Sequence, residues 1–187
     1  MDAVVTAVGV VGQTGELSPL YDVPAPVRAA ISFALVLVVG AGLLYFRERA
    51  VHRAVDLTIQ GTPLAVVHGG IAFGLLAFVG GYAIAQMGRV TTDLVFLRAS
   101  LVALGLAGVA LGGFGYLVVG IWVTEVEGDR RPWVGAAVGA GISAVPFVVP
   151  TLFVAVLGWL LLAAFGLGNV TREWIHGDRT VEAEGGG

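Results

Sequence analysis

The sequence predicts an all-α membrane protein, a helical bundle of five hydrophobic segments of which the last two form a short proline-bent hairpin. Of the 187 residues, 57% are hydrophobic and a further 29 are glycine, a share that a soluble domain of this size could not bury. Charged residues make up 12%, half of the usual ~25%, and they divide the chain into long uncharged runs. Composition therefore excludes a soluble domain and a disordered chain. The absence of cysteine also excludes a disulfide scaffold.

The first three uncharged runs each supply one membrane-spanning helix. They contain 18, 32 and 26 residues, and a hydrocarbon core of ~30 Å needs about 20 helical residues. We expect spans at 27–46, 63–86 and 94–123. Residues 1–26 would precede them as an N-terminal extension, and residues 171–187 would follow the last span as a polar C-terminal tail.

An amphipathic helix is predicted at 47–60, directly after the first span. One face carries apolar residues and the other carries mostly charged ones, a pattern typical of a helix that lies on or just beneath the lipid headgroups. The apolar residues are Phe46, Ala50, Val51, Ala54 and Val55, and the polar ones are Arg49, His52, Arg53 and Asp56.

Turn and capping residues predict where the next helices begin and end. Thr62 is a candidate N-cap for the second span, with Pro63 at the first helical position. Met87–Gly88 would break that span. Thr92 is a candidate N-cap for the third span, and Asp93 would lie in its first turn, where the helix dipole favours a negative charge.

The fourth uncharged run has 40 residues, too many for one span. Its apolar part would extend about 54 Å as a single helix at 1.5 Å per residue. Pro146 and Pro150 interrupt it, and proline removes a helix hydrogen bond and disfavours the helical conformation of the preceding residue. We therefore expect two short spans, 133–147 and 150–168, which complete a transmembrane domain at 27–170. One long kinked helix is the alternative.

Arginine counts predict the orientation, because cytoplasmic loops carry an excess of basic residues. With five spans and an external N-terminus, seven arginines fall inside and three outside, whereas four spans would give five and five. The count favours the hairpin. It predicts a multi-pass protein of the cell membrane with its N-terminus outside and its C-terminus in the cytoplasm. The inside arginines are Arg47, Arg49, Arg53, Arg130, Arg131, Arg172 and Arg179, and the outside ones are Arg28, Arg89 and Arg98.

Small residues predict how the spans associate, since helices in lipid depend on close packing rather than on hydrophobic burial. Three spans contain G-x-x-x-G pairs, which favour a tight bundle or a homo-oligomer. The glycines could pack within the chain, against a second copy or against another membrane protein. The remaining partner that the sequence predicts is the lipid bilayer. The pairs are Gly70 with Gly74, Gly108 with Gly112, and Gly135 with Gly139.

His68 and Arg98 lie inside predicted spans, where ionisable groups are functional candidates. His68 lies one turn into the second span. It is either a proton carrier or ligand, or a histidine near the headgroups that bonds a carbonyl. Arg98 lies one turn into the third span. It either snorkels to the outer interface or pairs with a carboxylate such as Asp93.

Two further features invite functional interpretations that the sequence supports less well. Pro146 and Pro150 are typical of a broken helix at a transporter site, but with no polar side chain nearby a simple hairpin turn is favoured. Ser143 invites comparison with intramembrane serine proteases. Its proton acceptor would have to be His68, at the opposite membrane depth. Gly168–Asn169 is interpreted as a helix C-terminal cap.

Enzymatic chemistry is not expected from this sequence. No carboxylate lies deep in a predicted span, and the chain has neither lysine nor cysteine. We therefore predict no catalytic residues, no cofactor and no metal site. The formal charge of −3 gives no basic footprint for nucleic acid.

The order of features resembles a known family. An arginine-rich amphipathic helix (FRERAVHRAV) is followed by a G-x-P-L junction at 61–64, glycine-rich spans, and a proline-bent hairpin that ends in FGLGN at 165–169. Over residues 28–170 this is similar to the transmembrane module of bactofilin-like, polymer-forming proteins of halophilic archaea, and the lysine-free composition is typical of such organisms. The polymerising β-solenoid does not precede it here. The resemblance implies a membrane-embedded anchor or partner-binding module and supplies no catalytic residues.

These observations favour a non-enzymatic membrane scaffold or anchor of uncharacterised role, acting through glycine-mediated helix packing and oligomerisation. The alternative is a small-solute transporter or channel subunit, with the break between Pro146 and Pro150 and His68 near its path.

Overall fold

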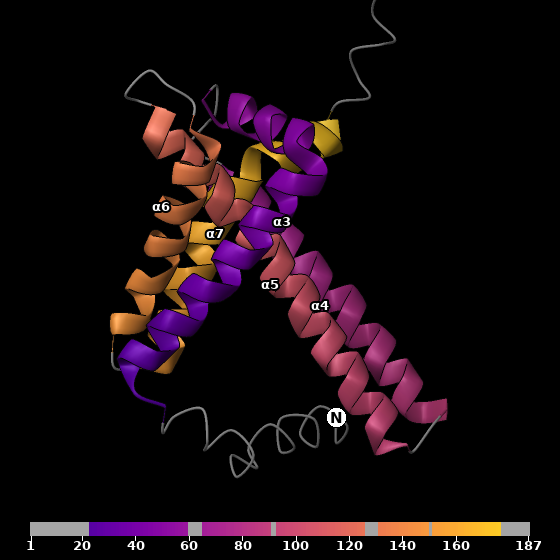
Figure 1. Ribbon diagram of the computed structural model, residues 1–187. Helices are drawn as coiled ribbons and strands as arrows, with labels where there is room; N and C mark the ends of the chain where they lie inside the picture. The colour runs from indigo at the N-terminus through magenta and orange to yellow at the C-terminus, as the bar shows by residue number, and fades with distance from the viewer. Residues whose placement is uncertain (1–22, 60–64, 91–92, 126–130, 150, 177–187) are drawn as a thin grey trace, which may run out of the picture.

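The computed structural model describes residues 23–59, 65–90, 93–125, 131–149 and 151–176. Within these ranges the chain forms five α-helices and one short 3-10 helix, and no strand (Figure 1). The all-α fold with five hydrophobic segments is therefore confirmed. The elements, labelled as in Figure 1, are α3 (Ala25–Ile59), α4 (Ala65–Val90), α5 (Leu94–Glu125), α6 (Pro132–Ala144), η1 (Val145–Val148) and α7 (Leu152–His176).

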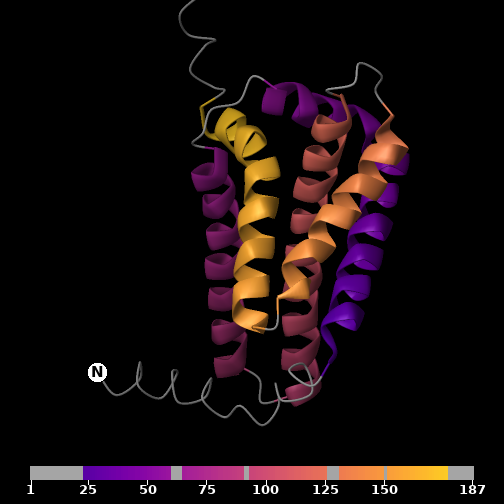
Figure 2. The same ribbon diagram turned by 90° about the vertical axis from the view of Figure 1, so that its left-hand side faces the viewer.

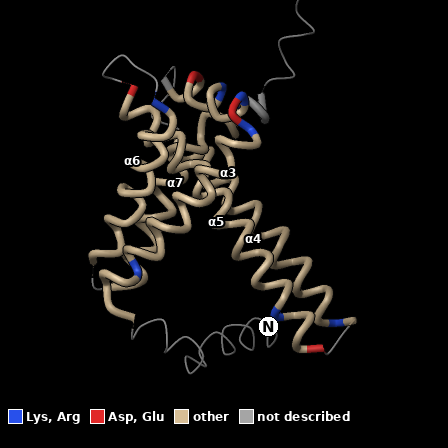
Figure 3. The backbone as a smooth tube through the Cα atoms, in the orientation of Figure 1, with Lys and Arg blue, Asp and Glu red and all other residues tan. Residues whose placement is uncertain are grey.

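Four of these helices, α3, α4, α5 and α7, are long and apolar enough to cross a bilayer, and α6 with η1 forms a shorter apolar segment, Pro132–Val148. The spans run up and down between two ends of the bundle (Figures 1 and 2). We call the end that holds η1 the hairpin end, and the end that holds the C-termini of α5 and α7 the tail end. The described charged residues gather near these two ends (Figure 3), as expected for a chain that crosses a membrane.

The predicted hairpin in the last uncharged run is confirmed, and the single kinked helix is wrong. Helix α6 ends at Ala144, η1 follows, and Val149 is extended with φ −69° and ψ 134°. This conformation fits a residue that precedes a proline. Pro150 itself lies outside the described residues. Helix α7 then returns to the tail end, so that α6 and α7 meet at the hairpin end and diverge toward the tail end (Figure 2).

The bundle is tight near the tail end and open near the hairpin end. Figure 1 shows α4 and α5 leaving the group formed by α3, α6 and α7, so that the two groups make an inverted V. The halves of α4 and α5 that lie nearest the hairpin end, residues 75–90 and 94–106, contain no buried residue. We call these two halves the arm. Its side chains are exposed or half-buried throughout.

Close contacts between backbones hold the tail-end half together. A Cβ on Gly115 would meet the carbonyl of Ala163, and a Cβ on Gly69 would meet the carbonyl of Ala164. Gly168 lies in the same way against the backbone of Ala65. Such contacts bring helix axes closer than side chains would permit, which is how helices associate in lipid.

The amphipathic segment is confirmed as a helix, and it begins at a kink. Arg47 has non-helical angles, φ −140° and ψ 33°, between the spanning part of α3 and its last part, which lies across the tail end (Figure 1). Val51, Ala54 and Val55 are buried against the protein, in a cluster with Leu44 and with residues of α5. Their apolar face therefore covers the end of the bundle rather than lipid.

Phe46 and Ala50 do not share that buried face, contrary to the sequence interpretation. The side chain of Phe46 is 77% exposed, and Ala50 is exposed as well. The kink at Arg47 explains the difference for Phe46, because it removes the helical phase that relates this residue to those after the kink.

Several predicted helix boundaries are corrected. Helix α4 continues to Val90, so Met87–Gly88 does not break it. Asp93 precedes α5 rather than lying in its first turn, and its carboxylate accepts the backbone N–H of Val95 at 2.9 Å. Asp93 is thus a capping residue. Thr92 lies outside the described residues, as do Thr62 and Pro63.

The predicted cap at Gly168–Asn169 is wrong. Helix α7 runs to His176, two turns beyond these residues. Gly168 is used instead for its small size, because the backbone of Ala65 in α4 occupies the space of a side chain. Asn169 is buried.

Candidate functional site

Four polar side chains form a hydrogen-bonded chain inside the bundle, which we call the polar chain. The hydroxyl of Ser32 donates to the backbone oxygen of Ser143 at 3.0 Å, and the indole Nε1 of Trp159 donates to the Oγ of Ser32 at 3.1 Å. The hydroxyl of Ser143 donates to the carbonyl of Ala140 at 2.7 Å. The hydroxyl of Tyr116 donates to the carbonyl of Trp159 at 2.9 Å. The polar chain therefore joins α3, α5, α6 and α7.

The topology of the hairpin places these groups together. Ser32 lies seven residues into α3, Trp159 lies seven residues into α7, and Ser143 is one residue before the end of α6. All three positions are close to the hairpin end, at a depth of about 10 Å along α3 and α7. The sequence interpretation that no polar side chain lies near Pro146 is therefore wrong.

The donors of the polar chain are used within it, which limits what it can do chemically. The Ser143 hydroxyl donates its proton to the carbonyl of Ala140. None of the four side chains of the polar chain is an acid or a base. His68 is in the first turn of α4 at the tail end, so the structure does not bring it to Ser143. A nucleophile needs a proton acceptor within hydrogen-bond reach, and the polar chain provides none. These hydrogen bonds between helices stabilise the packing of the bundle.

A groove of about 340 Å³ opens beside the polar chain. One stripe of α3 and one stripe of α7 form its walls, with a single residue from α5 at the far end and one from η1 at the near end. The walls are almost entirely apolar apart from Arg28, Ser32 and Trp159. The α3 stripe is Arg28, Ile31, Ser32, Leu35 and Val36; the α7 stripe is Leu152, Val156 and Trp159; the end residues are Val109 and Phe147, and Val23, just before α3, completes the lining.

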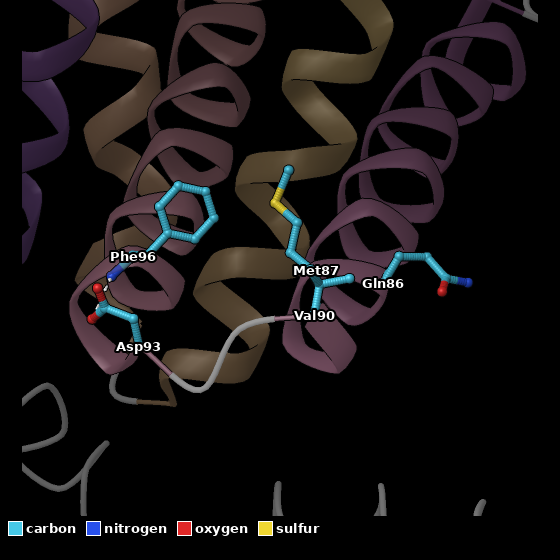
Figure 4. A pocket seen from close by; sticks show the side chains of 5 residues that line it. All are labelled: Gln86, Met87, Val90, Asp93 and Phe96. Carbon is cyan, nitrogen blue, oxygen red and sulfur yellow. Dashed lines mark hydrogen bonds between the residues drawn. The ribbon is translucent and has the colours of Figure 1, made fainter.

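A second hollow of about 530 Å³ lies at the tip of the arm, between the end of α4 and the start of α5. Gln86, Met87 and Val90 line it from α4, and Asp93 and Phe96 line it from the other side (Figure 4). The Asp93 carboxylate accepts the backbone N–H of Phe96 at 3.5 Å, the bond drawn in Figure 4. The charged side chain that lines this hollow, Asp93, therefore caps the N-terminus of α5.

The other predicted candidate residues are spread over both ends of the bundle. His68 is half-buried at the tail end, whereas Arg98 is exposed in the second turn of α5 near the hairpin end. Pro146 is buried and packs against α7, with its Cβ 3.6 Å from the Cβ position of Gly158. Pro150 lies outside the described residues. The structure thus brings Pro146 near Ser143 but does not bring His68 near either of them. Within the described residues no group of three histidine or acidic side chains is placed to hold a metal.

The six glycines predicted to pack divide into two kinds. Gly112 lies against the ring of Trp159, Gly135 against Ile121, and Gly139 against the carbonyl of Tyr116. Gly108 has only the side chain of Leu76 at 4.0 Å. Gly70 and Gly74 have no described neighbour within 4 Å of their Cβ positions. This last pair therefore presents an open face of α4.

Sequence reasoning missed Ser32 and Trp159 as functional candidates. Ser32 is a single hydroxyl inside an apolar run, and hydroxyls in spans commonly bond across helices, so its presence was a usable signal. Trp159 gave no such signal, because its spacing fits an ordinary apolar face.

Comparison with protein-family models, with curated proteins and with solved structures gives no match.

Proposed function

We propose that this chain is an integral membrane scaffold or anchor module that acts through glycine-mediated helix packing and oligomerisation, without enzymatic activity. Its interior supports this proposal. Where helices meet, glycine backbones and the polar chain fill the contacts, and the donors of the polar chain bond within it rather than facing a water-filled path. A transporter would need polar groups converging on a wet cavity at mid-depth.

The open pair on α4 is the observation that carries the proposal. Gly115, Gly120 and Gly69 each meet the backbone of a neighbouring helix, but Gly70 and Gly74 meet nothing within the described residues. A small-x-x-x-small pair on an outward face is suited to a helix from a second copy. We infer that α4 pairs with α4 of another copy through this face.

Replacing the pair with larger residues tests this inference. Gly70→Ile with Gly74→Ile should convert an oligomer to a monomer, because the side chains would keep the two backbones apart. The matched control is Gly42→Ile with Gly105→Ile, since both control positions are equally open but neither belongs to such a pair. Single-molecule photobleaching in lipid vesicles counts the copies. A monomeric wild-type protein, or an oligomer that survives the α4 substitutions, contradicts the proposal.

We propose further that the protein lies in the cell membrane with its tail end on the cytoplasmic side and its N-terminus outside. The arginine distribution supports this, because the elements of the tail end hold Arg47, Arg49, Arg53, Arg131 and Arg172, and basic residues concentrate on the cytoplasmic side. The relation to the transmembrane module of bactofilin-like proteins of halophilic archaea stays a proposal, and it rests on the sequence motifs alone.

A small-solute transporter or channel subunit is the second candidate, favoured by one observation. The helix break at Pro146 lies beside the buried hydroxyls of Ser32 and Ser143, and broken helices with polar groups form substrate sites in transporters. Flux in proteoliposomes distinguishes the two functions. Flux that is lost in His68→Ala or Ser143→Ala would favour transport, whereas the scaffold proposal predicts no flux in any of these proteins.

A further inference from the structure

The groove between α3 and α7 has a charged mouth and an apolar wall. Arg28 lies in the first turn of α3, at the hairpin end. The α3 stripe then continues through Ile31 and Leu35 to Val36. Ser32 and Trp159 are the polar groups of the wall, but the indole donates to the Ser32 oxygen and the Ser32 hydroxyl donates to Ser143. A molecule in the groove would therefore meet an apolar surface along its length and a guanidinium at its outer end.

The length of the groove matches one leaflet of a bilayer. From Arg28 to Val36 the stripe rises eight residues, or about 12 Å at 1.5 Å per residue. Half of a hydrocarbon core of ~30 Å is about 15 Å. With Arg28 at the depth of the headgroups, the groove would end before the midplane, at Val109 of α5.

The bilayer itself supplies an occupant that fits these features. An unbranched acyl chain would lie along the apolar stripes of α3 and α7, and a headgroup at its outer end would meet Arg28. The alternative occupant, a helix of a second copy, would shield Trp159 from lipid and is distinguished by the test below.

We propose that this groove binds one anionic membrane lipid, with an acyl chain between α3 and α7 and the headgroup phosphate at Arg28. The charge of Arg28 selects an anionic headgroup over a neutral one, since a basic side chain at the membrane surface attracts anionic lipid. The bound lipid fills the space on the inner side of the inverted V, between α3 and α7 of one group and Val109 of α5 in the other. This proposal does not depend on the scaffold function.

Quenching of Trp159 fluorescence by brominated lipid tests the proposal. The full-length chain carries four tryptophans, and Trp122→Phe, Trp133→Phe and Trp174→Phe together leave Trp159 as the reporter in the groove. In nanodiscs, phosphatidylglycerol with brominated chains should quench it at about a fivefold lower mole fraction than phosphatidylcholine with the same chains. Equal quenching by the two lipids overturns the proposal. Absence of quenching by both also overturns it, because the groove is then covered by protein.

Substitution of Arg28 locates the selectivity. Arg28→Gln should abolish the preference for phosphatidylglycerol, and Arg28→Lys should keep most of it. The matched control is Arg98→Gln, at the same end of the bundle but on the arm and away from the groove. A preference that survives Arg28→Gln, or that Arg98→Gln removes equally, contradicts the assignment.

A second measurement does not require the reporter protein. Native mass spectrometry of the wild-type chain purified from vesicles of both lipids should show one retained phosphatidylglycerol, and the Arg98→Gln protein should show the same. Retention of phosphatidylcholine at an equal level overturns the proposal.

Discussion

The indole Nε1 of Trp159 donates a hydrogen bond to the hydroxyl oxygen of Ser32 across 3.1 Å, which joins two helices that are 127 residues apart in the chain. The same indole ring rests on the bare backbone of Gly112 and lies 5.4 Å from the ring of Tyr116, measured between centroids. One side chain on α7 thus contacts both α3 and α5, which belong to different groups of the inverted V.

Removing this hydrogen bond should loosen the junction of the three helices. Trp159→Phe keeps an aromatic ring but loses the donor, and hydrogen bonds between membrane helices contribute about 0.6 kcal/mol on average and up to about 1.7 kcal/mol. We expect a lower midpoint of thermal unfolding in detergent. Trp133→Phe is the control, because Trp133 is 60% exposed. Equal effects of the two substitutions would show that the bond to Ser32 does not stabilise the bundle.

A side chain at Gly115 should disrupt the contact of α5 with α7. The carbonyl of Ala163 occupies the position of a Cβ, so Gly115→Val must move backbone atoms, and overpacking of this kind costs about 1–3 kcal/mol or more. Gly105→Val, on the same helix where the Cβ position is open, should leave the free energy of unfolding nearly unchanged. The result is measured by steric trapping or by denaturant titration in detergent. A tolerated Gly115→Val would contradict the backbone contact.

The cap at the start of α5 gives a local prediction. Asp93→Ala removes the acceptor for the backbone N–H groups of Val95 and Phe96, which should destabilise the helix end by about 1 kcal/mol. Asp93→Ser should retain most of the cap. Amide hydrogen exchange at Val95 reports the change directly: it should accelerate in the alanine variant and stay close to wild type in the serine variant. Unchanged exchange in both would show that the carboxylate does not cap the helix.

The amphipathic part of α3 should be held by protein contacts more strongly than by lipid charge. Val55→Asp places a carboxylate in the fully buried cluster with Leu117 and Ile121, and it should release the segment and expose it to protease. Arg49→Glu with Arg53→Glu weakens the attraction to anionic lipid but leaves the cluster intact, so the gain in cleavage should be smaller. The reverse order of protease sensitivity would indicate that lipid, not the bundle, holds this helix.

The elements of the fold followed from the sequence because each depends on local physics. The length of an uncharged run sets whether a helix spans the bilayer, and Pro146 with Pro150 limits how far α6 can continue. Boundaries were less accurate where glycine was interpreted as a stop. Gly88 and Gly168 both lie inside helices, because tertiary packing or a continuous run of helix formers outweighs the weak local preference of glycine.

The candidate site could not be predicted in the same way, because it depends on which helix faces which. Gly69 and Gly70 are neighbours in the sequence, yet only Gly69 meets another backbone. Helical periodicity groups residues on one face but does not identify the partner of that face. Ser32 and Ser143, which are 111 residues apart, meet only because the hairpin brings the end of α6 to the start of α3.

The most direct test of the account is the side of the membrane on which each end of the hairpin lies. The chain has no cysteine, so single cysteines at Arg131→Cys, Arg172→Cys and Arg98→Cys can be labelled separately in intact cells with a membrane-impermeant maleimide. The account predicts that positions 131 and 172 are both protected and that position 98 is labelled. Labelling of position 172 together with protection of position 131 would mean that the last two helices cross the membrane only once, and would contradict the hairpin.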